Sequence, residues 1–167
     1  MRRDALRRGC DYHELTRDDY RWMWAAYKFG SFANLIEEGL DEDGFVIAIT
    51  SIMEEYYLRS GTAIVPTAYF GGRREMAPVG LVLVDYSQDA FWPHVLWFEW
   101  ATPRNRIECA VKFLMELKEQ GNLLILAEKK DIPFFSHLAR YAILNRRCLL
   151  KKYFDDGDAV LYQGVKK

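Results

Sequence analysis

The sequence predicts one α/β (α+β) domain over residues 1–167, with helices flanking a mixed, mostly antiparallel sheet. Three β-rich segments with short connections follow one another, at residues 62–70, 79–86 and 93–101. Sequential strands of this kind form an antiparallel meander. The amphipathic segment 104–120 then leads to the apolar run 122–128. This strand–helix–strand order predicts a right-handed crossover that makes 94–101 and 122–128 parallel neighbours.

The N-terminal part of the chain carries helical periodicity. Apolar side chains recur at three- and four-residue steps within residues 17–29 and predict the first helix, with a short strand expected before it at 11–15. Residues 45–58 fit either a strand or a helix, because FVIAIT is β-rich while a helical stripe of apolar residues continues beyond it. We predict a helix here, capped by Asp41 or Asp43.

The C-terminal part predicts a short fourth helix and a closing hairpin. Asp131 followed by Pro133 is typical of a helix start. Two β-rich segments follow, at 144–154 and 159–163, and the sequence DDGD between them is a hairpin signal. The expected order is therefore strand, two helices, three strands, helix, strand, helix and two strands.

Composition argues against several classes of protein. Half of the residues are apolar and 15% are aromatic, which suits a folded core. The formal charge of −1 argues against nucleic acid as the partner, because phosphate binding needs a positive excess. No run approaches the 18 apolar residues of a membrane span, and no apolar segment follows the four arginines of the first ten residues. We expect a soluble, cytoplasmic protein without a secretion signal.

Cysteine and histidine spacing predicts neither a disulfide framework nor a metal site. The three cysteines, Cys10, Cys109 and Cys148, lack the CxxC spacing of zinc ribbons. The three histidines, His13, His94 and His137, lack metal-ligand spacing. The cysteines are expected to be reduced thiols.

The succession of elements resembles the GNAT superfamily of acyl-CoA N-acyltransferases over roughly the last 100 residues. The motifs WATPRNRIECAVKFL, FFSHLARYAIL and YFDDGDAVLYQ also resemble small GNAT-like proteins of tailed bacteriophages, including internal virion proteins. The resemblance implies a GNAT-like sheet whose parallel pair, 94–101 and 122–128, splays apart to admit the pantetheine arm of acetyl-CoA. It also implies that backbone N–H groups at the start of the third helix hold the pyrophosphate.

The implied acetyl-CoA site lies in the turn before the third helix. Its candidate residues are Trp100, Ala101, Arg104, Asn105, Arg106, Ile107, Cys109 and Ala110. The family loop has the pattern R/Q-x-x-G-x-G/A, whereas this stretch contains no glycine and places the anionic Glu108 near the expected pyrophosphate. Side chains at the glycine positions are expected to crowd the ligand. The alternative is an ordinary solvated first helical turn.

Catalysis by this fold needs a base and an acid. Glu99 is the candidate base, because a carboxylate in the central strand between two tryptophans would be desolvated and its pKa raised. The alternative is a structural carboxylate at the rim of the sheet. In the family, a tyrosine of the fourth helix acts as the acid, and its position falls near Phe134 or Phe135. Tyr141, about two turns further on, is the candidate acid of this chain, with core packing as its alternative role.

Two functions from different classes follow. The first is a GNAT-fold protein with a degenerate acetyl-CoA loop that works as a phage-type structural or interaction component, such as a minor virion protein. Its partners would be phage structural proteins or a host target, and it would lie in the host cytoplasm or in the virion. The second is an active acetyl-CoA-dependent N-acetyltransferase acting on an amine or a protein.

Overall fold

The computed structural model describes residues 9–33, 35–70, 73–128, 134, 150–155 and 159–164. The N-terminal elements are β1 (Cys10–Glu14), the 3-10 helix η1 (Arg17–Asp19), α1 (Tyr20–Lys28) and α2 (Glu42–Leu58). The central strands are β2 (Thr62–Ala68), β3 (Ala77–Pro78), β4 (Gly80–Ser87) and β5 (Ala90–Trp97). The remaining elements are α3 (Pro103–Gln120), β6 (Asn122–Glu128), β7 (Leu150–Asp155) and β8 (Ala159–Gly164).

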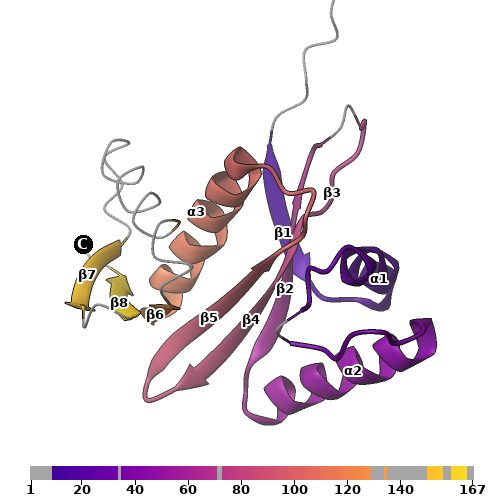
Figure 1. The fold of residues 1–167 in the computed structure, drawn as a ribbon. Coiled ribbons are helices and arrows are strands. Elements are labelled where there is room, and N and C mark those ends of the chain that lie inside the picture. The colour runs from indigo at the N-terminus through magenta and orange to yellow at the C-terminus, as the bar shows by residue number, and fades with distance from the viewer. Residues whose placement is uncertain are drawn as a thin grey trace, which may run out of the picture.

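The molecule has three layers, with the sheet in the middle. The strand order is β1-β2-β4-β5-β6-β8-β7, with β3 added beside β2. Figure 1 shows α1 and α2 on one face of the sheet and α3 on the other. The predicted fold class, a mixed and mostly antiparallel sheet flanked by helices, is confirmed.

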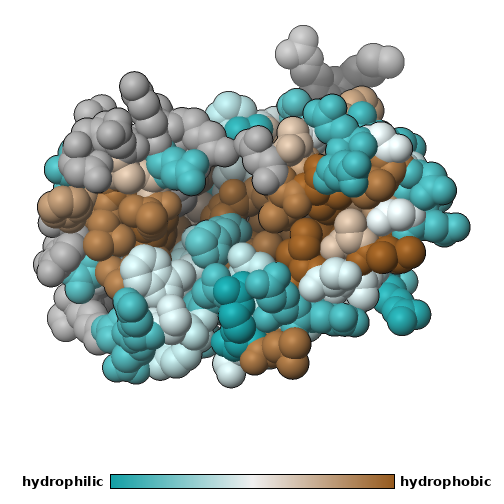
Figure 2. Space-filling model, turned by 60° about the horizontal axis from the view of Figure 1, so that its bottom comes forward, coloured by the Kyte–Doolittle hydropathy of each residue, from teal (hydrophilic) through white to brown (hydrophobic). Residues whose placement is uncertain are grey.

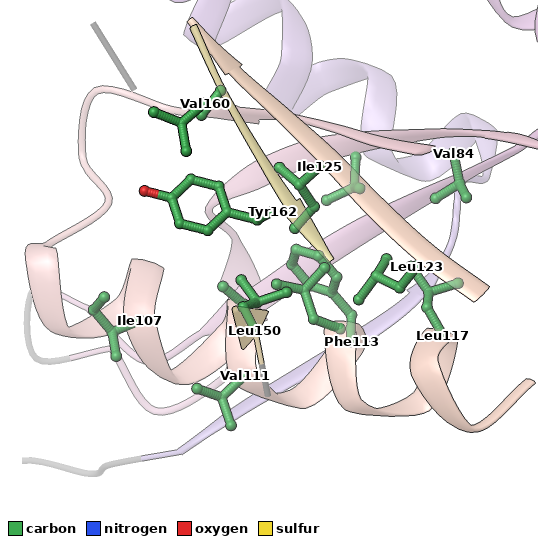
Figure 3. Packing of buried hydrophobic residues seen from close by; sticks show 14 residues of the cluster. Val84, Ile107, Val111, Phe113, Leu117, Leu123, Ile125, Leu150, Val160 and Tyr162 are labelled. Atoms are coloured by element: carbon green, nitrogen blue, oxygen red, sulfur yellow. The ribbon is translucent and has the colours of Figure 1, made fainter. Parts of the chain in front are cut away.

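Each face of the sheet has its own core. On the α3 face, residues from one stripe of the helix, including Phe113 and Leu114, meet side chains of β4, β6 and β8. Figure 3 shows this packing, with Phe113, Leu117 and Leu123 between the helix and the strands. On the other face, α1 and α2 pack on alternate residues of β2 and β4. Because successive side chains of a strand point to opposite faces of the sheet, the same strands contribute side chains to both cores.

Helix α2 resolves the ambiguous segment in favour of a helix. Phe45, Ile49 and Met53 recur every four residues and are all buried, so they form the stripe that packs on the sheet. The Asp41 carboxylate accepts the N–H of Gly44 at 2.8 Å and caps the first turn. Within the described residues, no helix is both long and apolar enough to cross a bilayer.

The other predicted elements agree to within a few residues where the structure describes them, apart from two differences; residues 144–149 of the predicted strand 144–154 lie outside the described residues. Strand β5 is Ala90–Trp97, so the predicted boundaries of 93–101 and 94–101 were wrong. The chain leaves the strand after Trp97 because Phe98 is the start of a turn, in which the Ala101 N–H donates to the Phe98 carbonyl at 2.9 Å. The two-residue strand β3 was not predicted. Apart from residue 134, the predicted fourth helix lies outside the described residues.

The parallel pair exists, but it is short. Strands β5 and β6 pair only at Ala90↔Asn122 and Phe91↔Leu123, whereas β4 and β5 pair along their whole length. Beyond Phe91, β6 therefore turns away from β5 and continues its pairing with β8. The splay predicted for this pair is confirmed.

Gly80 marks the tightest contact between β4 and β5. A Cβ at this position would lie 2.8 Å from the Leu96 carbonyl oxygen and 3.0 Å from Cε3 of Trp97. We expect Gly80→Ala to lower the free energy of unfolding by about 1–3 kcal/mol, because the backbone of β5 must shift. Urea denaturation measures the loss. The control is Gly44→Ala in the first turn of α2, where the closest neighbour of an added Cβ is the Asp41 side chain at 3.0 Å and not backbone, so the loss should be smaller. Equal losses in both variants would contradict the steric argument.

Candidate functional site

The turn that follows β5 is held by hydrogen bonds to the chain at the end of β3 and the start of β4. The Phe98 N–H donates to the Val79 carbonyl at 2.9 Å, and the Phe98 ring is completely buried. The Trp100 indole N–H donates to the Pro78 carbonyl at 2.8 Å. These bonds fix the path of the chain between β5 and α3.

Glu99 lies in this turn and is exposed. The sequence prediction placed it inside the strand, desolvated between two tryptophans, and that placement was wrong because the strand ends at Trp97. Its backbone N–H donates to the Ser31 hydroxyl at 3.2 Å, which ties the turn to the segment after α1. The carboxylate is accessible at the carboxyl end of β5, and its role as a base stays a prediction.

Helix α3 begins with a closed capping box. The Thr102 hydroxyl accepts the Asn105 N–H at 3.1 Å, and the Asn105 side-chain oxygen accepts the Thr102 N–H at 3.2 Å. Pro103 occupies the first helical position and has no N–H. The Arg106 N–H already donates to the Thr102 carbonyl at 3.1 Å. Three of the positions that would present amide donors to an anion are therefore closed.

The arginines of the first turn also have partners within the chain. Arg104 forms an ion pair with Glu108, with 2.7 Å between Nε and Oε1. Arg106 Nε donates to the Ala101 carbonyl at 3.2 Å. An anion at this end of α3 would have to compete with both contacts.

The side chains expected to crowd the ligand point elsewhere. Ile107, Cys109 and Ala110 are buried against the sheet. Crowding from these positions was therefore the wrong reason for a poor fit to pyrophosphate. The capping box and Pro103 give the physical reason, because they remove the amide donors.

The edge of β5 that faces β6 carries a proline where the pairing stops. Peptide groups alternate between the two edges of a strand, and the Phe98 N–H points to the β4 side. The odd-numbered residues of β5 therefore turn their peptide groups toward β6: Phe91, Pro93, Val95 and Trp97. Pro93 has no N–H to give to β6, so one ladder hydrogen bond is missing just beyond the last pair, at Phe91. Further along β5, the peptide groups of Val95 and Trp97 face away from β4 and pair with no strand among the described residues.

One aromatic contact links the end of β5 to the region after β6. The rings of Trp97 and Phe134 meet edge to face, with centroids 5.9 Å apart. Phe134 stands where the resemblance would place the acidic tyrosine, and its ring packs against the α3-face core instead. Tyr141 lies outside the described residues, so its assignment stays a prediction.

Cys109 and Cys10 lie together where α3 crosses β1 and β2. The hydrogen bond from the Cys109 thiol lowers the pKa of Cys10, and Lys112 acts in the same direction. The same hydrogen bond, together with burial, raises the pKa of Cys109.

We expect iodoacetamide at neutral pH to alkylate Cys10 before Cys109, because a lowered pKa and partial exposure give Cys10 more accessible thiolate. Peptide mapping by mass spectrometry distinguishes the sites. In a Cys10→Ser variant, Cys109 should stay unmodified until the protein is unfolded. Modification of both thiols at the same rate in the native protein would contradict this assignment.

Comparison with solved structures identifies the architecture. FdhC, described as a nucleotide-linked sugar GNAT, matches over 95% of this chain and 88% of its own, with a TM-score of 0.65 and 11% identity. This chain has a GNAT fold. The N-acetyltransferase PseH of Campylobacter jejuni, crystallised with acetyl coenzyme A, matches over 95% of this chain and 100% of its own, with a TM-score of 0.59 and 8% identity.

A domain from Methanocaldococcus jannaschii matches over 94% of this chain and 98% of its own, with a TM-score of 0.61 and 14% identity. No protein-family model matches the sequence, and no curated protein matches it. The expected resemblance to GNAT acetyltransferases is confirmed at the level of the fold. The resemblance to bacteriophage proteins stays a prediction.

Sequence reasoning missed three features of the site, namely Ser31, Pro93 and the Thr102 cap. The pattern Thr102-Pro103-x-Asn105 is a readable capping signal, with proline at the first helical position. The contact from Ser31 to Glu99 joins residues 68 positions apart, and no local pattern predicts it. Among the described residues, no group of three potential metal ligands occurs.

Proposed function

We propose that the GNAT-fold chain binds an acyl-CoA thioester along the open edge of β5 and transfers the acyl group to an amine. The observation that carries the proposal is the short pairing of β5 with β6, which stops at Phe91, two residues before Pro93. A strand edge with unpaired peptide groups binds extended ligands through main-chain hydrogen bonds. The amides of a pantetheine arm are suited to such an edge. The acetyl-CoA complex of PseH, a fold neighbour, supports this choice of donor.

Glu99 is the residue of this chain placed to assist the reaction. The amine nitrogen attacks the thioester carbonyl carbon, so that a C–N bond forms and the C–S bond breaks. The amine loses one proton, which the exposed Glu99 carboxylate accepts directly or through water, and the thiolate that leaves takes a proton from solvent. The turn that carries Glu99 is anchored at Ser31 and Pro78, which fixes its position beside the end of β5.

A second function is favoured by the capping box of α3. Because Thr102 and Pro103 remove amide donors, the helix start does not fit a pyrophosphate. A GNAT-fold protein whose third helix lacks amide donors for a pyrophosphate fits a role in binding or assembly, such as a component of a phage particle or a partner of a host protein. In that role the chain would bind no donor.

Titration of acetyl-CoA by calorimetry separates the two functions. Under the enzymatic proposal, we expect saturable heat at a Kd below about 1 mM. S-acetylpantetheine should bind within about tenfold of acetyl-CoA, because affinity rests on the pantetheine arm when the pyrophosphate has few donors. The absence of heat with either ligand would overturn acyl transfer and leave the binding role.

A charge-reversal pair tests the first turn of α3. We expect Arg104→Glu with Arg106→Glu to weaken acetyl-CoA binding by about tenfold and to leave S-acetylpantetheine binding unchanged, because only the former carries phosphates. The matched control is Lys152→Glu, an exposed residue of β7. Equal loss for both ligands would show that the variant has damaged the fold and not phosphate recognition.

A further inference from the structure

A cluster of aromatic and arginine side chains surrounds the turn that carries Glu99. Trp100 is its centre, and the rings of Trp22, Phe29 and Phe70 lie 6.2, 6.4 and 6.1 Å from the Trp100 ring. The rings come from α1, from the chain just after β2 and from the turn after β5. We refer to Trp22, Phe29, Phe70, Trp100, Arg21 and Arg73 as the aromatic–arginine surface.

Two guanidinium groups are stacked on these rings. Arg73 lies over Trp22 at 4.9 Å and over Phe70 at 5.7 Å, and Arg21 lies over Trp22 at 5.5 Å. Stacking orients a guanidinium group and leaves its N–H donors available at the rim. Within the described part of the chain, neither Arg21 nor Arg73 forms an ion pair, although both are exposed. The surface therefore presents two oriented positive charges.

An apolar residue completes the surface. Phe29 is 68% exposed, and its ring meets Trp100 edge to face. Hydrogen bonds hold the segments on which the surface is built, from the Trp100 indole to Pro78 and from the Arg73 N–H to the Phe70 carbonyl. Aromatic and arginine residues on a rigid scaffold are the side chains that dominate protein interfaces.

We propose that the aromatic–arginine surface docks an acidic segment of a partner protein, with carboxylates at Arg21 and Arg73 and an apolar side chain against Phe29. Charge complementarity selects an anionic partner, because neither guanidinium group forms an ion pair within the described residues. A small molecule bound to a ring as exposed as Phe29 would itself remain mostly in water. A polypeptide segment is large enough to cover the ring. Two guanidinium groups are enough for a peptide with a few carboxylates, whereas nucleic-acid affinity needs many neutralised phosphates, which a chain with a net charge of −1 does not favour.

This surface does not depend on acyl transfer. It serves an acceptor protein beside Glu99 if the chain is an enzyme, and an assembly partner if it is not. Binding to this surface is measured without acetyl-CoA, so a failure of the donor proposal leaves the docking proposal untouched, and the reverse also holds.

Fluorescence anisotropy with a labelled random copolymer of glutamate and tyrosine tests the proposal on the full chain. We expect saturable binding that weakens as salt is raised, because exposed charges are screened. Arg73→Glu should raise the Kd by about tenfold or more, and Arg73→Lys by less, because lysine keeps the charge and loses the planar stack. Phe29→Ser should also weaken binding.

The controls separate docking from general charge and from folding. Lys152→Glu changes the net charge by the same amount as Arg73→Glu and lies on β7, so it should leave the Kd unchanged. Circular dichroism confirms that each variant is folded. Unchanged affinity in Arg73→Glu would overturn the proposal. Tighter binding of a labelled oligothymidylate than of the acidic copolymer would also overturn it and point to single-stranded nucleic acid.

Discussion

Replacing Phe98 by alanine is expected to lower the free energy of unfolding by about 3–5 kcal/mol, the range for a fully buried phenylalanine. The side chain is completely buried, and its ring centroid lies 6.0 Å from Phe32 and 5.2 Å from Trp100. A cavity here would remove packing from the turn that carries Glu99. Thermal and urea unfolding measure the change.

The matched control for this substitution is Phe154→Ala on β7, where the ring is 59% exposed. Its free energy of unfolding should change by no more than about 0.5 kcal/mol. If both variants lose the same stability, burial of Phe98 is not what holds the turn.

Opening the cap of α3 should tighten acetyl-CoA binding under the enzymatic proposal. Thr102→Gly removes the hydroxyl that accepts the Asn105 N–H and frees this donor for a phosphate oxygen. A charge-assisted hydrogen bond contributes about 1.5 kcal/mol or more, which corresponds to about tenfold in Kd. Glycine at an N-cap costs only a few tenths of a kcal/mol relative to threonine, so the helix should persist.

Thr102→Ser is the control, because serine keeps the capping hydroxyl and should leave the Kd unchanged. S-acetylpantetheine, which carries no pyrophosphate, should bind both variants alike. Calorimetry gives each affinity. A gain in Thr102→Gly that also appears with S-acetylpantetheine would contradict the role assigned to the Asn105 N–H.

The parts of the fold with strong local periodicity could be predicted from the sequence. Helix α3 and strand β6 agree with the predicted bounds to within one residue, because an amphipathic stripe and an apolar run bounded by Gly121 leave little ambiguity. The helical stripe of α2 likewise outweighed its β-rich beginning, since the apolar spacing continues over four turns.

The site could be predicted only in outline. Within the run 93–101, Phe98 and Trp100 continue the aromatic pattern after Trp97, so the pattern cannot show where the strand ends. The turn in which the Ala101 N–H donates to the Phe98 carbonyl ends it. Glu99 therefore lies in an exposed turn and not in the buried strand where the sequence prediction placed it. The candidate acetyl-CoA residues from Arg104 to Ala110 lie on α3, and their role in binding stays a prediction. Their side-chain directions and hydrogen bonds depend on contacts that local periodicity does not encode.

The short pairing between β5 and β6 affects how firmly the two parts of the sheet are joined. Strands β1 to β5 form one half of the sheet and strands β6 to β8 the other, and the two halves are joined by only two residue pairs between β5 and β6. The chain passes from the first half to the second through α3. A ligand lying along the odd-numbered edge of β5 would act as an additional strand and stiffen the junction. Such a ligand would then raise the resistance of both halves to unfolding, although it touches only the gap between them.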